Sequence, residues 1–162
     1  VSVLRKLGWD IDDEAVESGL YSVAWPARFE VLHTDDPWFV LDGGHNPQCA
    51  AALRECLEHY FPDSKRVALV GVLKDKDYKS IAATLAPLFD ACVCVTPPSE
   101  RALPAEELAE LFKDSCREVC VVDTVEDGVD LARDIAQEQD AMVCAFGSLY
   151  ICGQIRSCFG LR

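Results

Sequence analysis

The sequence has 162 residues, half of them apolar, and a formal net charge of -13 from 15 Lys and Arg against 28 Asp and Glu. This length suits one domain that buries about two thirds of its unfolded surface. The acidic balance argues against nonspecific binding to nucleic acid or anionic lipid, and no apolar stretch approaches the roughly 20 residues that span a bilayer. We therefore expect a soluble domain without nucleic acid or membrane partners.

The first part of the chain is predicted to lie outside this domain. Residues Val1 to Trp9 have the pattern of the end of a helix from a preceding domain, and Ile11 to Ala24 that of a connecting segment. We therefore divide the chain into residues 1–24, which link it to that domain, and residues 25–162, which form the domain itself.

Six strands are predicted in the domain. Residues Arg28 to Leu32 alternate between polar and apolar side chains, which is typical of an edge or antiparallel strand. Five continuous apolar runs follow: Trp38 to Leu41, Val67 to Val70, Ala91 to Val95, Val119 to Val122 and Met142 to Phe146. Continuous apolar runs are typical of strands that are buried on both faces.

Helical patterns separate these strands, because apolar residues recur there at spacings of three and four. The alternation predicts a three-layer, Rossmann-like α/β domain, in which helices cover both faces of a mainly parallel six-stranded sheet. In such sheets ligands bind beyond the carboxyl ends of the strands. This rule places the following residues on one rim: Asp42, Gly71, Thr96, Asp123 and Gly147.

The most informative motif is Asp42-Gly43-Gly44-His45-Asn46-Pro47, which joins an apolar run to a helical pattern. The glycines allow a sharp turn and close approach to a ligand. Asn46 is a good N-cap, and Pro47 suits the first helical position. The free amides at such a helix start favour an anion, so the turn is predicted to bind a ligand.

This motif resembles the D-G-A-H-N-P signature of folylpolyglutamate and dihydrofolate synthases, which belong to the Mur ligase superfamily. Three further segments are similar to motifs of that family: Trp25-Pro26-Ala27-Arg28 to W-P-G-R, Asp75-Lys76-Asp77 to D-K-D, and Gly147-Ser148-Leu149-Tyr150 to G-S-L-Y. Together they cover nearly the whole chain and match the family's carboxy-terminal domain. Ala27 stands where the family usually has glycine, and Gly44 where it usually has alanine, so we expect Gly44 to loosen the turn.

The resemblance implies a carboxy-terminal lobe of an ATP-dependent ligase that adds L-glutamate to folate or dihydropteroate. ATP would phosphorylate a carboxylate of the pterin substrate, and the amine of glutamate would attack the acyl phosphate. No G-x-x-x-x-G-K-[ST] phosphate loop occurs in the sequence. We therefore expect an amino-terminal ATPase domain of the same protein to hold most of ATP and Mg2+, and this chain alone, a monomer, to be inactive.

The resemblance implies nucleotide contacts from Arg28, Asp42 and His45. Arginine suits a phosphate because its planar fork donates two hydrogen bonds, and a carboxylate accepts hydrogen bonds from two adjacent hydroxyls. The alternatives are a solvated salt bridge for Arg28, a turn-capping role for Asp42, and a partly buried His45 bonded to a backbone carbonyl.

Glutamate contacts are implied for His45, Lys76 and Ser148, with His45 and Lys76 closest to the chemistry. The helix dipole at the motif favours a neutral His45 ring. Lys76 would pair with a carboxylate of glutamate, unless it is a solvated charge between two acids. Ser148 is the expected N-cap of the last helix, and a helix start with a hydroxyl also suits a carboxylate.

Other classes of site fit less well. Asp42, His45 and Ser148 do not form a hydrolase triad, since Ser148 lacks the G-x-S-x-G context and no later histidine follows. No G-x-G-x-x-G follows the first strand, which argues against a Rossmann oxidoreductase. A nonenzymatic binding or interaction domain remains the alternative.

The nine cysteines are predicted to be reduced and structural, because their number is odd and most lie inside apolar runs. There is no C-x-x-C pair, and His33, His45 and His59 have no ligand spacing, so no metal site is expected in this chain. Reduced thiols, without a signal-peptide pattern, indicate the cytoplasm.

Overall fold

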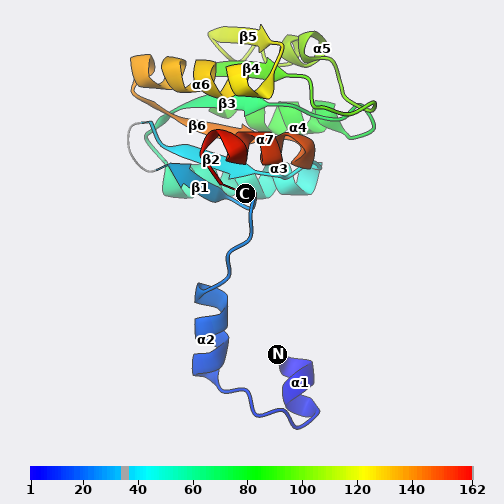
Figure 1. Ribbon diagram of the computed structural model, residues 1–162, viewed down its shortest axis with the longest axis vertical. Coiled ribbons are helices and arrows are strands. Elements are labelled where there is room, and N and C mark those ends of the chain that lie inside the picture. Colours follow the sequence, from blue (N-terminus) through cyan, green and yellow to red (C-terminus); the bar gives the residue numbers. More distant parts are fainter. Residues whose placement is uncertain (34–36, 162) are drawn as a thin grey trace.

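The computed structural model describes residues 1–33 and 37–161. A six-stranded sheet lies at its centre, in the order β1-β2-β6-β3-β4-β5 (Figure 1). The strands are β1 (Glu30–His33), β2 (Phe39–Asp42), β3 (Lys65–Val70), β4 (Ala91–Val95), β5 (Glu118–Val122) and β6 (Ala141–Phe146). β1 is antiparallel to β2, and the other neighbouring pairs are parallel. The predicted mainly parallel sheet with one antiparallel edge strand is confirmed.

Helices cover both faces of this sheet (Figure 1). They are α3 (Pro47–Tyr60), α4 (Tyr78–Leu85), α5 (Ala105–Glu110), α6 (Val125–Gln139) and α7 (Leu149–Cys158), with a 3-10 turn at Ala86–Leu88. Apolar residues of α3, α4 and α5, such as Leu53, Ile81 and Leu108, pack on one face. Those of α6 and α7, such as Val129 and Ile151, pack on the other. The three-layer α/β architecture follows from this alternation.

The predicted helix starts have the expected caps. The Asn46 side chain accepts a hydrogen bond from the backbone N–H of Cys49 at the start of α3, and Pro47 occupies the first turn. Thr124 caps α6 in the same way, and Ser148 caps α7. These caps fix where the chain leaves each strand tip and enters a helix.

The first strand begins later than its alternating pattern predicts. Residues Arg28 and Phe29 precede β1, and both Ala27 and Phe29 have left-handed backbone angles, with φ of 56° and 44°. A strand cannot contain such residues. The turn exists because Ala27 N–H donates to Glu30 Oε2 at 2.8 Å, which folds the chain back before β1 starts.

The amino-terminal segment lies apart from the sheet and its covering helices (Figure 1). It forms α1 (Ser2–Lys6) and α2 (Asp13–Tyr21), and neither helix has a buried residue. The segment predicted as a connection therefore contains a nine-residue helix, capped by Asp12. This helix has only nine residues, so its apolar residues repeat too few times for the sequence pattern to distinguish it from a linker. The boundary at residue 24 stays a prediction.

All nine cysteines are free, and five are buried. Burial raises the pKa of Cys116 and of Cys152 to about 11, and raises that of the fully buried Cys144 still further. A thiol that stays protonated is a poor nucleophile and a poor metal ligand. These side chains therefore act as small core residues. Across residues 1–33 and 37–161, every helix is too short or too polar to cross a membrane.

Candidate functional site

The Asp42-Gly43-Gly44-His45 turn lies at the carboxyl end of β2, where Asp42 ties two turns together. Its Oδ1 accepts a hydrogen bond from Gly44 N–H at 2.7 Å, and its Oδ2 accepts one from Phe29 N–H at 2.9 Å. The Gly43 N–H in turn donates to the Ala27 carbonyl at 2.8 Å. The predicted turn-capping role of Asp42 is therefore present in the structure, and it links the Trp25-Pro26-Ala27-Arg28 segment to the rim.

Both glycines of this turn are packed tightly. A Cβ atom at Gly43 would lie 2.3 Å from a methyl carbon of Leu149, and one at Gly44 would lie 2.6 Å from Asp42 Oδ1 and 2.8 Å from Cys49 Cβ. The expectation that Gly44 loosens the turn is wrong. The space that an alanine methyl would need is already filled by Cys49 and by the Asp42 carboxylate.

Arg28 and Asp42 share a pocket of about 160 Å³. Phe29 and residues of α3 complete its lining, among them Cys49 and Cys56. The Arg28 guanidinium makes one long hydrogen bond, 3.4 Å from Nη1 to the Ala27 carbonyl. Its other N–H groups remain open to a ligand, as far as residues 1–33 and 37–161 show.

His45, Lys76 and Ser148 line a second cavity of about 170 Å³, together with Leu73, Arg101, Leu149 and Tyr150. They come from the turn after β2, the loop after β3 and the start of α7 after β6. Because β2, β6 and β3 are neighbours whose ends lie in register, their three tips meet at one rim. The structure thus brings the three residues predicted for glutamate together, and keeps them separate from the Arg28 and Asp42 pocket.

Two of these side chains have a defined hydrogen-bonding state. His45 Nδ1 lies 3.0 Å from the Gly43 carbonyl oxygen, and a carbonyl only accepts, so Nδ1 is the donor in this contact. In a neutral ring this arrangement leaves Nε2 as the acceptor. Ser148 is 2% exposed, and its Oγ accepts from Tyr150 N–H at 3.2 Å. Its own hydroxyl hydrogen is left to donate.

Arg101 is a member of this cavity that the sequence did not single out. Its Nη1 lies 2.8 Å from Asp75 Oδ2, and its Nη2 donates to the Tyr150 hydroxyl at 3.2 Å. The hydrogen bond to Tyr150 and the charge of Asp75 raise the pKa of Arg101 above its ordinary value. Lys76 Nζ lies 3.9 Å from the same Asp75 oxygen. No motif surrounds Arg101, and its only sequence signal is a position in the loop that follows β4.

The other predicted rim residues have structural roles or lie elsewhere. Thr96 Oγ1 accepts from Ala105 N–H at 3.0 Å and so caps α5. Gly147 has φ of 109°, and a Cβ there would lie 2.7 Å from the Gly71 carbonyl oxygen. Asp123 follows β5, the far edge strand, and lines neither cavity.

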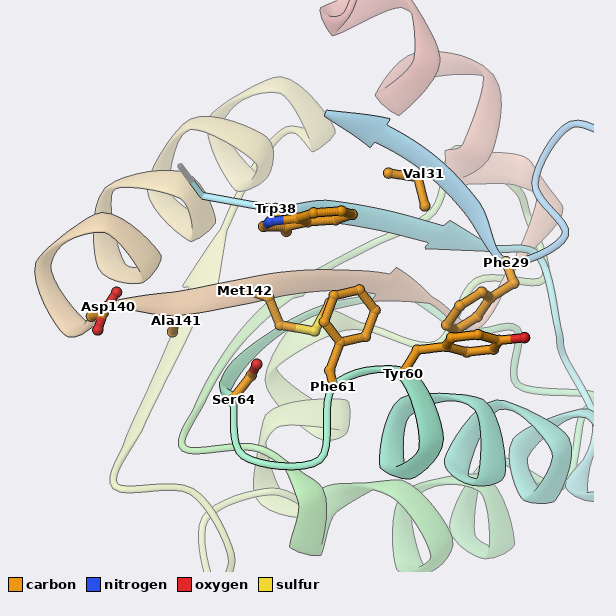
Figure 2. Close-up of a pocket in the computed structure, with 9 residues that line it drawn as sticks. All are labelled: Phe29, Val31, Trp38, Tyr60, Phe61, Ser64, Asp140, Ala141 and Met142. Atoms are coloured by element: carbon orange, nitrogen blue, oxygen red, sulfur yellow. The ribbon is translucent and has the colours of Figure 1, made fainter. Parts of the chain in front are cut away.

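A third cavity, of about 790 Å³, is larger than these two and contains none of the predicted site residues (Figure 2). It is lined by Phe29, Val31, Trp38, Tyr60, Phe61, Ser64, Asp140, Ala141 and Met142. Ala141 and Met142 open β6, and Trp38 precedes β2. The cavity therefore reaches the amino ends of these parallel strands, away from the tips that carry His45 and Ser148.

No metal centre is evident in the part of the chain that the structure describes. It contains no group of three or more His, Cys, Asp or Glu arranged to hold an ion. The carboxylates nearest the two cavities are already engaged, Asp42 by backbone amides and Asp75 by Arg101. Residues 1–33 and 37–161 offer charged side chains for an organic anion and no cluster of oxygen ligands for Mg2+.

Comparisons with known proteins agree with the fold described above. Residues 27–149 match the model of the family described as Mur ligase, glutamate ligase domain. The chain is 36% identical to a probable bifunctional folylpolyglutamate synthase/dihydropteroate synthase of Halobacterium salinarum, over 91% of the chain and 18% of that protein. It is 34% identical to the dihydrofolate synthase/folylpolyglutamate synthase of Mycobacterium tuberculosis, over 93% of the chain and 34% of that protein.

Solved structures show the same fold. Folylpolyglutamate synthase of M. tuberculosis, complexed with ADP and AMPPCP, superposes with a TM-score of 0.87 at 30% identity, covering 96% of this chain and 37% of that one. The bifunctional enzyme of Yersinia pestis, complexed with AMPPNP and a Mn ion, gives 0.86 at 29% identity, covering 99% and 37%. The chain thus spans about a third of these relatives or less. It belongs to the Mur ligase family, as a glutamate ligase domain.

Proposed function

We propose that this chain is the lobe of an ATP-dependent ligase that positions L-glutamate and part of ATP. The full-length enzyme would join glutamate to folate or dihydropteroate through an acyl phosphate, in the cytoplasm and as a monomer. The names of the relatives support this substrate class, since they are folylpolyglutamate and dihydrofolate synthases. An amino-terminal ATPase domain of the same protein is the expected partner of this lobe.

One observation carries the proposal: His45, Lys76 and Ser148 converge from three strand tips on one cavity of about 170 Å³. Pockets for drug-sized ligands start at about 300 Å³, so this cavity suits a ligand of amino-acid size. It is lined by Lys76 and Arg101, two cations, in a chain with net charge -13. An anionic amino acid fits this combination of size and local charge.

The cavity residues have the chemistry that amide formation needs. The glutamate amine attacks the acyl carbon, the phosphate leaves, and the nitrogen loses a proton. With Nδ1 donating to Gly43, a neutral His45 ring would present Nε2 as an acceptor for a hydrogen of that amine. Lys76 and the Ser148 hydroxyl donate to carboxylate oxygens. The lobe would thus act by positioning and by preorganised charge.

The adjacent pocket suits the nucleotide. Arg28 is exposed and weakly bonded, so its fork is available to a phosphate oxygen. Asp42 uses one lone pair on each oxygen for the backbone and keeps others for a nucleotide hydroxyl. Mg2+ would accompany ATP and be held mainly by the ATPase domain, because the described residues of this lobe form no cluster of three or more metal ligands.

The test is ligation by the full-length protein. Incubation with ATP, Mg2+, L-glutamate and either tetrahydrofolate or dihydropteroate should release ADP, and omission of glutamate should stop the release. The 162-residue chain alone should release none above background, because it has no phosphate loop. A full-length protein that binds these ligands without turnover would favour a nonenzymatic binding domain instead.

A further inference from the structure

We propose that Arg101 binds the side-chain carboxylate of the incoming amino acid and thereby selects a dicarboxylic substrate. The inference rests on the proposed ligase function and adds to it a residue that determines specificity. Arg101 lines the same cavity as His45, Lys76 and Ser148, but it comes from a different part of the rim. Its position there indicates which end of the substrate it meets.

The order of the strands orients the substrate along the rim. Arg28 and Asp42, which face the nucleotide pocket, lie beside the β2 tip, and His45 follows in the same turn. β6, β3 and β4 succeed β2 in the sheet at spacings of about 4.8 Å. The reacting amine must meet the acyl phosphate that ATP generates, so it points to the β2 end. The other end of the amino acid then points toward the loop after β4, which carries Arg101.

Lys76 lies between these two ends, in the loop after β3. One carbon separates the amine from the α-carboxylate of glutamate, whereas three carbons separate it from the side-chain carboxylate. Lys76 therefore suits the α-carboxylate, and Arg101 the distal one. Lys76 and Arg101 thus offer one cation to each carboxylate of glutamate, and Asp75, which pairs with both, holds them beside each other. Glutamine would present only one carboxylate to this pair.

Arg101 has hydrogen-bonding capacity left for this task. A guanidinium carries five N–H groups, and in the described part of the chain Arg101 uses two, one with Asp75 and one with the Tyr150 hydroxyl. These two partners hold the fork in place from two sides. A fixed fork with unused donors is suited to a carboxylate, which it can bind through two parallel hydrogen bonds.

The backbone around Arg101 is also fixed to the neighbouring loop. The Arg101 carbonyl accepts from Lys74 N–H at 2.8 Å, and Leu73 and Ala102 form an antiparallel bridge. Leu103 N–H donates to the Val72 carbonyl at 3.0 Å. The loop after β4 is thus tied to the loop that presents Lys76, which fixes the separation of the two backbone positions from which the cations extend.

The test compares amino acid substrates in the full-length enzyme. Arg101→Ala should raise the KM for L-glutamate by about tenfold to hundredfold, the range for loss of a charged hydrogen bond. The KM for ATP should stay within about twofold. The ratio of kcat/KM for glutamate to that for glutamine should fall by a similar factor, because glutamine gains nothing from Arg101. Arg101→Lys should restore part of this ratio, since it keeps the charge but not the fork.

Lys74→Ala is the matched control, because it removes a cation from the same pair of loops, outside the cavity. It should leave the glutamate to glutamine ratio unchanged. If Arg101→Ala weakens both amino acids equally, Arg101 binds the α-carboxylate or supports the loop, and the specificity role is wrong. An active wild-type enzyme with an unaffected Arg101→Ala variant would also overturn it. An inactive wild-type enzyme would instead count against the ligase function itself.

Discussion

At the scale of single residues, Asp42 combines a structural role with its proposed contact to the nucleotide. Its two oxygens accept hydrogen bonds from Phe29 and Gly44, so it fastens the turn before β1 to the turn after β2. Ala27 and Phe29 hold left-handed backbone angles in that first turn, each at a cost of about 1 to 2 kcal/mol. The Asp42 carboxylate is one of the groups that offsets this strain.

We predict that Asp42→Ala lowers the free energy of unfolding of this chain by about 3 kcal/mol, through loss of two charge-assisted hydrogen bonds. Asp42→Asn should cost less, because its amide keeps one acceptor oxygen. Arg28→Ala should cost under about 1 kcal/mol, since its one hydrogen bond is 3.4 Å long. Urea unfolding of the three variants measures this. Equal stability of Asp42→Ala and wild type would show that the Asp42 hydrogen bonds to Phe29 and Gly44 do not stabilise the fold. Because Arg28→Ala should leave the fold nearly unchanged, it is the better variant for measuring the contribution to ATP binding.

Sequence motifs singled out side chains that the structure brings together, and the binding roles of these side chains stay predictions. The motifs identified His45, Lys76 and Ser148, and the structure gathers them in one cavity. Arg101 was not predicted, because its position in this cavity depends on the pairing of two loops that are distant in sequence. The packing of Gly44 was also beyond prediction, since it depends on where the Cys49 side chain lies.

At the scale of elements, the amino-terminal helices differ from the rest of the chain. α1 and α2 bury no residue, and large apolar side chains such as Leu7, Trp9 and Tyr21 are more than 60% exposed. Short helices without tertiary packing are marginal in water. They therefore contribute little to the stability of the sheet and its covering helices.

We predict that a chain of residues 25–162 unfolds with the same free energy as the whole chain, within about 0.5 kcal/mol. The measurement is urea unfolding of both, followed by hydrogen exchange of the whole chain, in which amides of α1 and α2 should exchange fastest. A loss above about 2 kcal/mol on truncation would contradict the boundary at residue 24. It would mean that the segment packs against the domain in solution.

The order and type of the main elements could be predicted because local and long-range signals agree. Four of the five continuous apolar runs became strands that are buried on both faces, whereas β5 is an edge strand in which no residue is fully buried and Val121 is 40% exposed. Asn46, Thr124 and Ser148 begin helices where their cap chemistry predicts. The start of β1 was harder to predict from the sequence. Alternation continued through Arg28 and Phe29, while tertiary hydrogen bonds to Glu30 and Asp42 bent the backbone there.

At the scale of the whole molecule, buried thiols link stability to pH. Burial keeps the pKa of Cys144 well above its ordinary value in the folded chain. Above about pH 9 the thiol ionises in the unfolded chain and stays protonated in the folded one, so the unfolded state binds fewer protons. The free energy of unfolding then falls as pH rises, by up to about 1.4 kcal/mol per pH unit for each such thiol.

We predict that wild-type stability declines between pH 9 and 10, and that Cys144→Ala declines less steeply, by about the slope of one thiol. Urea unfolding at pH 8, 9 and 10 gives both slopes. Groups common to both proteins cancel in the comparison, and a general loss of packing in the variant changes the level without changing the slope. Parallel slopes would mean that Cys144 ionises in the folded chain too.

At the scale of the whole molecule, the proposed function also has to account for the net charge of -13, because the lobe would have to attract an anionic amino acid. A few placed donors at the rim, Lys76 among them, would overcome the long-range repulsion. The most direct measurement is therefore the initial rate of full-length Lys76→Ala, first against glutamate and then against ATP. We predict a rise in the KM for glutamate of about tenfold or more, a KM for ATP within about twofold of wild type, and partial rescue by Lys76→Arg. If both constants shift equally, or neither shifts, Lys76 is a solvated surface charge and the glutamate site lies elsewhere.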